Sequence, residues 1–232
     1  MKILALDTAT ENCSAALWVD GSLMQREVEV PRGHAELILT MIDELLAQSA
    51  TPLAGLDAIA FGRGPGSFTG VRLAASVTQG LAFGADLPVV PISDLQAVAQ
   101  RALGLSMHAA SHHILVCNDA RMHEVYWACF ERGAEGLMTA AGIERVSKPA
   151  DVHLPPEWAG TLVSAAGRGF AAYTELRERL SQTLTDINMS ILPGAGEIAA
   201  LAVAEVRNGR VLPAEEAVPV YLRDDVARPK AP

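Results

Sequence analysis

The sequence predicts an α/β protein built from two related lobes, and three observations indicate this class. Half of the 232 residues are hydrophobic and 19% are charged, which is typical of a well-packed globular protein. Strand-like and helical patterns follow in the order β-β-β-α-β-α-β-α over residues 1–104. Strand–turn–strand and strand–glycine–helix patterns then recur within residues 105–193, which indicates a second, reduced copy of the first lobe.

Three short strands are expected at the start of the chain. A small polar turn follows the first strand, and Asp20-Gly21 after the second is a strong hairpin signal. The first turn carries Asp7 and Thr10, an arrangement that can face phosphate but is weak evidence on its own. The three strands are expected at residues 2–6, 13–19 and 23–30.

Helices and further strands complete the first lobe. An amphipathic stripe that includes Ile38, Met41 and Leu45 predicts a helix over residues 34–48, and core packing explains the stripe. Two more strands are expected at residues 56–61 and 87–92, and two more helices at 71–84 and 94–103.

A glycine-rich turn, Gly62–Gly70, joins a buried strand to the second helix. Free backbone N–H groups at a helix start can hold an anion, but no phosphate motif fits this turn. Thr69 stands where the last glycine of G-x-G-x-x-G should be, and the absence of Gly-Lys-Ser/Thr excludes a Walker A loop. Ser67 lacks the flanking glycines of a nucleophile elbow. Ser67 or Thr69 is instead expected to cap the helix that follows.

The helix at residues 71–84 is apolar on all sides, since only Arg72 and Gln79 are long and polar. Such a helix has to be covered on every face, and its small residues would let another helix approach closely. Two interpretations stay open at this point. The helix is buried inside its own domain, or one of its faces is kept for a partner chain.

The second half of the chain predicts the reduced lobe and a tail. A late helix at about 194–208 could pack back on the first lobe, and residues 209–232 form an extended C-terminal tail. Within the reduced lobe, strands are expected at residues 114–118, 124–130 and 162–166, and a helix at 171–180.

Charge and cysteine content exclude several classes of function. A formal charge of −9 argues against autonomous nucleic-acid binding, because phosphate neutralisation needs surplus Lys and Arg. The three cysteines are well separated and form no C-x-x-C pair, which favours a reduced, intracellular compartment. The first strand is too short for a signal peptide, and no apolar run is long enough to span a membrane. We therefore expect a cytoplasmic protein.

Two polar clusters each allow a functional and a structural interpretation. His108, His112 and His113 have a spacing that suggests metal ligands, but without nearby Cys or Glu a surface cluster is the favoured interpretation. Asp119 to Glu124 is best explained as a salt-bridged turn inside an apolar hairpin. No Ser/His/Asp or Cys/His arrangement can be assembled, so no catalytic residue and no metal site are expected.

Several motifs in order resemble the bacterial TsaB family, also called YeaZ, over essentially the whole chain. The resemblance implies an actin-like (ASKHA) fold of two related lobes, each with a mixed β-sheet and flanking helices. It also implies a required non-catalytic role in threonylcarbamoyladenosine formation on tRNAs that read codons beginning with A. The motifs are Leu4 to Thr10, Gly62 to Arg72, Asp119-Ala120-Arg121 with Glu124-Val125-Tyr126, and Pro219 to Arg223.

The partners that the resemblance implies are proteins rather than cofactors. They are the metal-binding paralogue TsaD in a heterodimer, the ATPase TsaE, and a second copy of the chain in a homodimer, with tRNA contacted only indirectly. The paralogue carries two histidine ligands at positions that match Asp94 and Val98 here, so the metal site is expected to be dismantled. Homodimer and heterodimer are expected to compete for overlapping surfaces.

Two site predictions follow from the same resemblance. The first two helices of the N-terminal lobe are expected to form the partner interface, and the interlobe cleft to be a degenerate, at most weakly binding nucleotide site. An ATP-dependent kinase or hydrolase is therefore the alternative function, and a metallopeptidase is a less favoured one. The interface residues are His34, Leu37, Ile38, Met41, Val71, Ala74, Ala75, Thr78 and Ala82. The cleft residues are Asp7, Thr8, Thr10, Gly167 and Gly169.

Overall fold

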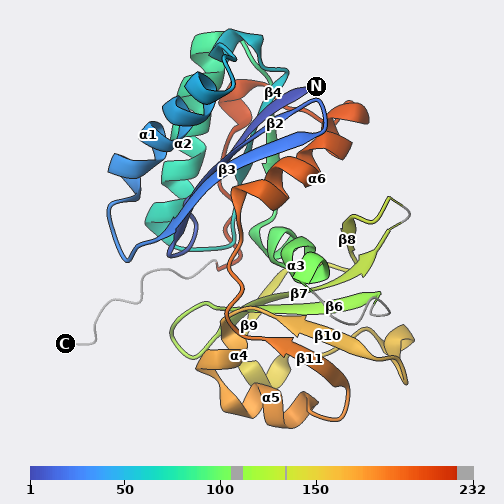
Figure 1. Ribbon diagram of the computed structural model, residues 1–232. Coiled ribbons are helices and arrows are strands. Elements are labelled where there is room, and N and C mark those ends of the chain that lie inside the picture. Colours follow the sequence, from blue (N-terminus) through green and yellow to red (C-terminus); the bar gives the residue numbers. More distant parts are fainter. Residues whose placement is uncertain (106–111, 134, 224–232) are drawn as a thin grey trace, which may run out of the picture.

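The computed structural model describes residues 1–105, 112–133 and 135–223. It has two lobes, one above the other in Figure 1, and each is built around its own β-sheet. Both the first part of the chain and the late helix α6 belong to the N-terminal lobe, and the C-terminal lobe lies between them in the sequence. None of the helices in the described ranges combines the length and apolar character needed to cross a membrane.

The N-terminal sheet has five strands in the order β3-β2-β1-β4-β5. The first three strands pair antiparallel, and β4 and β5 continue the sheet in parallel from β1. Asp20 and Gly21 both adopt positive φ values, 48° and 99°, which a tight hairpin between β2 and β3 requires. The strands are β1 (Lys2–Asp7), β2 (Asn12–Val19), β3 (Ser22–Glu29), β4 (Ala58–Gly62) and β5 (Val89–Ile92).

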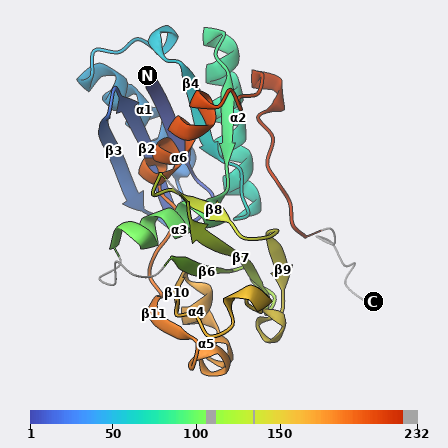
Figure 2. The ribbon, with the colours of Figure 1, turned by 90° about the vertical axis from the view of Figure 1, so that its right-hand side faces the viewer.

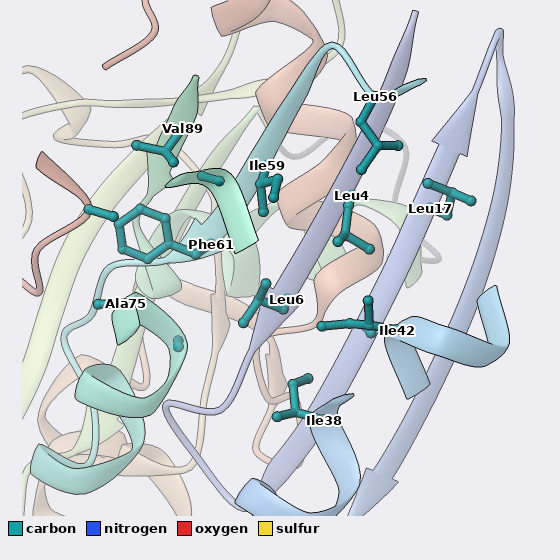
Figure 3. Close-up of a cluster of buried hydrophobic side chains, with 14 of the residues drawn as sticks. Leu4, Leu6, Leu17, Ile38, Ile42, Leu56, Ile59, Phe61, Ala75 and Val89 are labelled. Carbon is teal, nitrogen blue, oxygen red and sulfur yellow. The ribbon is translucent and has the colours of Figure 1, made fainter. Parts of the chain in front are cut away.

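Helices cover both faces of this sheet. α1 (His34–Gln48) and α2 (Phe68–Ala85) pack on one face, where side chains such as Leu6, Phe61 and Ile38 form a fully buried cluster (Figure 3). α6 (Ala195–Arg207) packs on the opposite face and buries its own cluster against β1, β2 and β4. The 90° rotated view shows the sheet between these two helical layers (Figure 2).

The C-terminal sheet repeats the topology of the first. Its strand order is β11-β10-β6-β7-β8, again with an antiparallel hairpin (β6–β7) flanked by two parallel additions, and β9 also pairs with β7. The expected repetition is therefore confirmed at the level of strand pairing. The strands are β6 (His113–Asp119), β7 (Val125–Arg132), β8 (Met138–Ala140), β9 (Arg145–Ser147), β10 (Val163–Ala166) and β11 (Leu184–Asn188).

Several elements differ from the sequence-based expectations. The sequence predicts neither the short strand β9 nor the edge strand β11. The helix expected at 171–180 is two short helices, α4 (Gly169–Ala172) and α5 (Thr174–Leu180), separated by Tyr173 in an extended conformation. α3 (Asp94–Leu105) lies between the lobes, because Ala97 belongs to a core cluster of the first lobe while Leu95 and Val98 pack with strands of the second.

The chain after α6 returns along the N-terminal lobe and then crosses to the other lobe. Leu212 forms an isolated antiparallel bridge with Val89 at the edge strand β5. The extended segment Pro219–Arg223, which we call the strap, contacts both lobes. Four 3₁₀ turns, at Leu53–Gly55, Pro149–Asp151, Pro156–Trp158 and Ala214–Glu216, complete the described elements.

Candidate functional site

The glycine-rich turn before α2 packs directly against the turn between β1 and β2. A Cβ atom on Gly70 would lie 2.0 Å from the carbonyl oxygen of Thr8, and one on Gly66 would lie 2.5 Å from that of Ala9. Ser67 N donates to Ala9 O at 2.7 Å, while the Ser67 side chain makes no capping hydrogen bond. The glycines are therefore needed for close backbone packing, and the expected side-chain cap from Ser67 is wrong.

Two fully buried carboxyl groups, Asp7 and Asp94, lie behind this turn. Burial raises the pKa of Asp7 from 3.8 to about 6, with backbone hydrogen bonds and Asp94 opposing the shift. Burial, followed by the neighbouring Asp7 charge, raises the pKa of Asp94 well above its ordinary value. The Asp7 charge thus disfavours ionisation of Asp94, and within the described residues Asp7 Oδ2 and Asp94 Oδ1 have no hydrogen-bond partner.

This acid pair fixes the glycine-rich turn in place. Gly64 N donates to Asp94 Oδ2, and Asp94 N donates to Gly64 O at 3.1 Å, while Ala9 N donates to Asp7 Oδ1 at 2.8 Å. A Cβ on Gly62 would come within 2.4 Å of Asp94 and 2.7 Å of Asp7. The pair thus connects β1, the turn after β4 and the start of α3, and its role is structural.

The expected partner interface has to be redrawn, because most of its residues lie in the core of the chain itself. Six side chains on α1 and α2 are at most 4% exposed, so no partner can touch them without unfolding the lobe. Figure 3 shows two of them, Ile38 and Ala75, among the buried side chains of the sheet. The six are Ile38, Val71, Ala74, Ala75, Thr78 and Ala82. Leu37 and Met41 are only half-buried, and so is His34.

The opposite face of α2 is open. Ser76, Gly80 and Gly84 are four residues apart and exposed, so they follow one line along the helix. A Cβ atom at either glycine would meet nothing within 4 Å. Phe83 beside them is 77% exposed, and Leu39 on α1 is 48% exposed. This surface, which we call the α1–α2 face, combines small residues with exposed apolar side chains.

His34 ties the start of α1 to the β1–β2 turn, since its Nε2 lies 2.8 Å from Thr10 O. A cleft of about 740 Å³ opens beside this contact, at the N-terminal ends of α1 and α2. The turn at 118–122 of the other lobe and strap residues 220–223 line its far side. Of the residues that the sequence predicts for an interlobe cleft, Thr8 and Thr10 line this one, whereas Asp7, Gly167 and Gly169 are not among its lining residues.

The residues expected to hold a nucleotide in this cleft do not fit one. Asp7 and Thr8 are buried, and the Thr8 hydroxyl donates to Gly70 O at 2.7 Å, so both side chains are shielded from a phosphate or its metal ion in the cleft. Gly167 and Gly169 pack against the carbonyl of Cys117, with ideal Cβ positions 2.4 Å and 2.7 Å from its oxygen. Their glycine character is explained by this packing alone.

The residues considered as metal ligands do not form a metal site within the described residues. Asp94 is fully buried with its Oδ2 accepting from Gly64 N, and Val98 is a fully buried core residue. His108 lies outside the described residues, and His113 stacks near Trp158 with ring centroids 4.3 Å apart. Among residues 1–105, 112–133 and 135–223, no group of three or more His, Cys, Asp or Glu could hold a metal ion.

The turn at Asp119–Glu124 is held by its own charges, as the structural interpretation expects. Arg121 pairs with Asp119 at 3.0 Å, and Arg223 of the strap pairs with Glu124. Arg121, Met122 and His123 all have φ values near +60°, which is unusual for side chains of this size. The sequence carries no glycine that would have signalled this left-handed turn.

The duplicated strand order and the paired lobes place the chain among proteins of actin-like fold. A family model described as "TsaD: tRNA N6-adenosine threonylcarbamoyltransferase" matches residues 28–231. Among curated proteins, the Escherichia coli tRNA threonylcarbamoyladenosine biosynthesis protein TsaB is 40% identical, over 100% of this chain and 99% of its own length. The Haemophilus influenzae protein of the same name is 42% identical, over 100% and 98%.

Two solved structures are similar to this chain over nearly its whole length. YeaZ from Pseudomonas aeruginosa is 38% identical with a TM-score of 0.84, covering 95% of this chain and 99% of its own. A second structure, described as an uncharacterized protein with similarity to peptidase YEAZ from Pseudomonas aeruginosa, is 41% identical with a TM-score of 0.88, covering 96% and 99%. The chain belongs to the TsaB (YeaZ) family.

Proposed function

We propose that this chain is a non-catalytic subunit in tRNA threonylcarbamoyladenosine formation, which acts by pairing its α1–α2 face with a TsaD-like paralogue. The names of its relatives support the pathway. The buried Asp94 and Val98, at the positions of the paralogue's metal ligands, support a role without catalysis. A TsaE-like ATPase would complete the assembly in the cytoplasm, and tRNA would be contacted through the partners.

The open surface of α2 is the observation that carries this proposal. Exposed apolar side chains on a folded chain often mark an interaction site, and Phe83 is the most exposed large apolar residue among those described. Gly80 and Gly84 leave space for a second helix to approach the backbone closely. A homodimer would use the same face, so homodimer and heterodimer should exclude each other.

Gly80→Glu tests the surface without disturbing the core, because a side chain there points into open space. We expect the variant to fold normally, to lose co-purification with the TsaD-like paralogue, and to fail to restore the modified nucleoside in depleted cells. Gly104→Glu is the matched control, since Gly104 is also an exposed helical glycine with nothing within 4 Å of its ideal Cβ.

Nucleoside mass spectrometry of tRNA separates the two parts of the proposal. If depletion of the chain leaves threonylcarbamoyladenosine unchanged, the pathway is wrong. If depletion removes the nucleoside but Gly80→Glu restores it as well as the wild type does, the pathway stands and the α1–α2 face is the wrong surface.

A further inference from the structure

Proteins of actin-like fold commonly close their two lobes around a nucleotide, and hinge closure of this kind normally depends on the ligand. The phosphate-facing residues of this chain are instead buried or committed to backbone contacts, as described above. The relative position of the lobes must therefore be fixed by something other than a bound nucleotide. The ion pairs across the cleft supply a candidate.

Three turns that face the cleft meet at one carboxylate. Glu11 lies in the β1–β2 turn of the N-terminal lobe, and its side chain pairs with two arginines of the other lobe, each at 3.5 Å. Arg121 comes from the β6–β7 turn, which is the duplicated counterpart of the β1–β2 turn. Arg168 comes from the glycine turn before α4, and it also pairs with Glu29 at the end of β3 at 2.5 Å.

We propose that Glu11, Glu29, Arg121 and Arg168 form a lobe latch, which holds the two lobes in one orientation without a nucleotide. Arg121 comes from the counterpart of the β1–β2 turn, and Arg168 lies between the two glycines that the sequence predicts at a nucleotide. Here the carboxylates of the opposite lobe neutralise them. Carboxylates of the same chain thus take the place that a bound phosphate would have, and the lobes stay closed without a ligand.

The exposure of these side chains determines how the latch responds to its surroundings. Arg168 is 34% exposed, Glu11 42%, Glu29 59% and Arg121 76%, so each pair is partly screened by water. Single pairs of this kind are weak, and a network sharing Glu11 and Arg168 is needed to hold the lobes. Salt should therefore weaken the latch, because the Debye length falls from about 10 Å at 0.1 M to about 3 Å at 1 M ionic strength.

The distance between spin labels on the two lobes tests the proposal directly. Labels at Asp43→Cys on α1 and Glu178→Cys on α5 occupy exposed positions, while the native cysteines are buried. In the otherwise unchanged chain, we expect a narrow distribution of label-to-label distances that Mg-ATP does not alter. In Arg168→Met, we expect this distance distribution to be broader. Arg177→Met is the matched control, because Arg177 bonds only within its own lobe in the described contacts, to Thr174 and Met189.

A double variant with exchanged charges tests the latch even if Arg168→Met is unstable. Arg168→Glu combined with Glu29→Arg restores one pair in the opposite sense, and we expect it to narrow the distribution relative to Arg168→Glu alone. Raising the salt should broaden the wild-type distance distribution more than that of Arg168→Met, which keeps only the Glu11–Arg121 pair of the latch. Equal distributions for the wild type and Arg168→Met, or a wild-type distribution that narrows only with Mg-ATP, would overturn the latch.

Discussion

At the scale of single residues, the Asp7–Asp94 pair is the most consequential feature of the N-terminal lobe. Two carboxyls that are fully buried side by side cannot both ionise cheaply, so one proton is retained between them. Asp94 Oδ2 accepts from Gly64 N and Asp7 Oδ1 accepts from Ala9 N, whereas the other oxygen of each carboxyl has no hydrogen-bond partner among the described residues. Asparagine has the shape of a protonated aspartic acid, with one donor and one acceptor, but it does not titrate.

We expect Asp94→Asn to flatten the pH dependence of stability. The pKa of Asp7 rises from 3.8 to about 6 on folding, so the stability that this carboxyl contributes is fully present below pH 4 and is lost as pH rises through 6. A shift of this size corresponds to about 3 kcal/mol. An amide at residue 94 would donate to the Asp7 carboxylate, lower its pKa and remove most of this loss.

Urea unfolding between pH 4 and pH 8 measures the effect of Asp94→Asn. The curves for variant and wild type should meet near pH 4 and separate towards pH 8, where the variant is the more stable. Asp43→Asn, on the exposed side of α1, should follow the wild-type profile. A variant curve that stays parallel to the wild type would show that the pair does not share a proton.

At the scale of elements, α2 carries two faces made of similar residues with opposite roles. The buried face packs Ala74 and Ala82 on the sheet, while the open face presents Gly80 and Phe83 to solvent. A small residue on the buried face allows close packing within the chain, whereas one on the open face leaves room for a second chain. The solvent exposure of a small residue on α2 distinguishes these two roles, whereas its size does not.

Phe83→Ala should reveal a difference between the free chain and the complex. In the free chain the ring is 77% exposed, so its removal should change the free energy of unfolding by less than about 0.5 kcal/mol. In the complex, an aromatic side chain at the centre of an interface can contribute about 2 kcal/mol or more. We therefore expect the affinity for the TsaD-like paralogue to fall at least about 30-fold by calorimetry.

Leu162→Ala provides the control for this prediction. Leu162 is also an exposed apolar residue, 67% exposed, but it lies before β10 in the other lobe. Its removal should leave the affinity for the paralogue unchanged. Equal losses for both variants would mean that Phe83 is no contact residue.

The sequence predicts the helix and its apolar character, but not which face is buried. Ala74 and Gly80 are equally small, and only the position of the sheet decides that one is covered and the other open. The same limit applies to Asp94, which follows Ser93 at a helix start and therefore resembles an ordinary capping residue. Its pairing with Asp7 joins segments 87 positions apart, and no local pattern contains that information.

Strand β11 shows a second reason for a missed element. Leu184–Asn188 has only one buried side chain, at Leu184, so it lacks the apolar run by which the other strands were recognised. It forms because β10 offers a free edge for parallel pairing. The hairpins and the central strands, by contrast, follow from apolar runs and turn residues that the sequence shows directly.

At the scale of the whole molecule, the strap connects the glycine-rich turn, the start of α2 and the other lobe. Val220 N donates to Arg63 O at 2.7 Å, and Tyr221 OH accepts from Arg72 Nε at 2.7 Å. The Arg72 guanidinium also lies 3.7 Å from the centre of the Phe68 ring. Arg223 then reaches the carbonyl of Ala120 at 3.1 Å in the other lobe.

Arg223→Met should loosen this connection without altering either core. We expect it to lower the free energy of unfolding by about 1–3 kcal/mol, because charged hydrogen bonds to Glu124 and Ala120 are lost in a partly buried site. Backbone amides of the left-handed turn at 121–123 should exchange faster with deuterium. Arg210→Met removes an exposed pair with Glu205 and should leave both quantities almost unchanged.

The position of α6 has a consequence for how the protein is made. The N-terminal sheet can bury its second face only when α6 arrives, and Asn12 and Ser14 on β2 complete hydrogen bonds with Pro193 and Ala195. During synthesis, the first lobe therefore waits for the whole second lobe to leave the ribosome before it can close. The first face, with α1 and α2, is available much earlier. Nascent chains would thus expose the apolar second face of the N-terminal sheet until α6 has been translated.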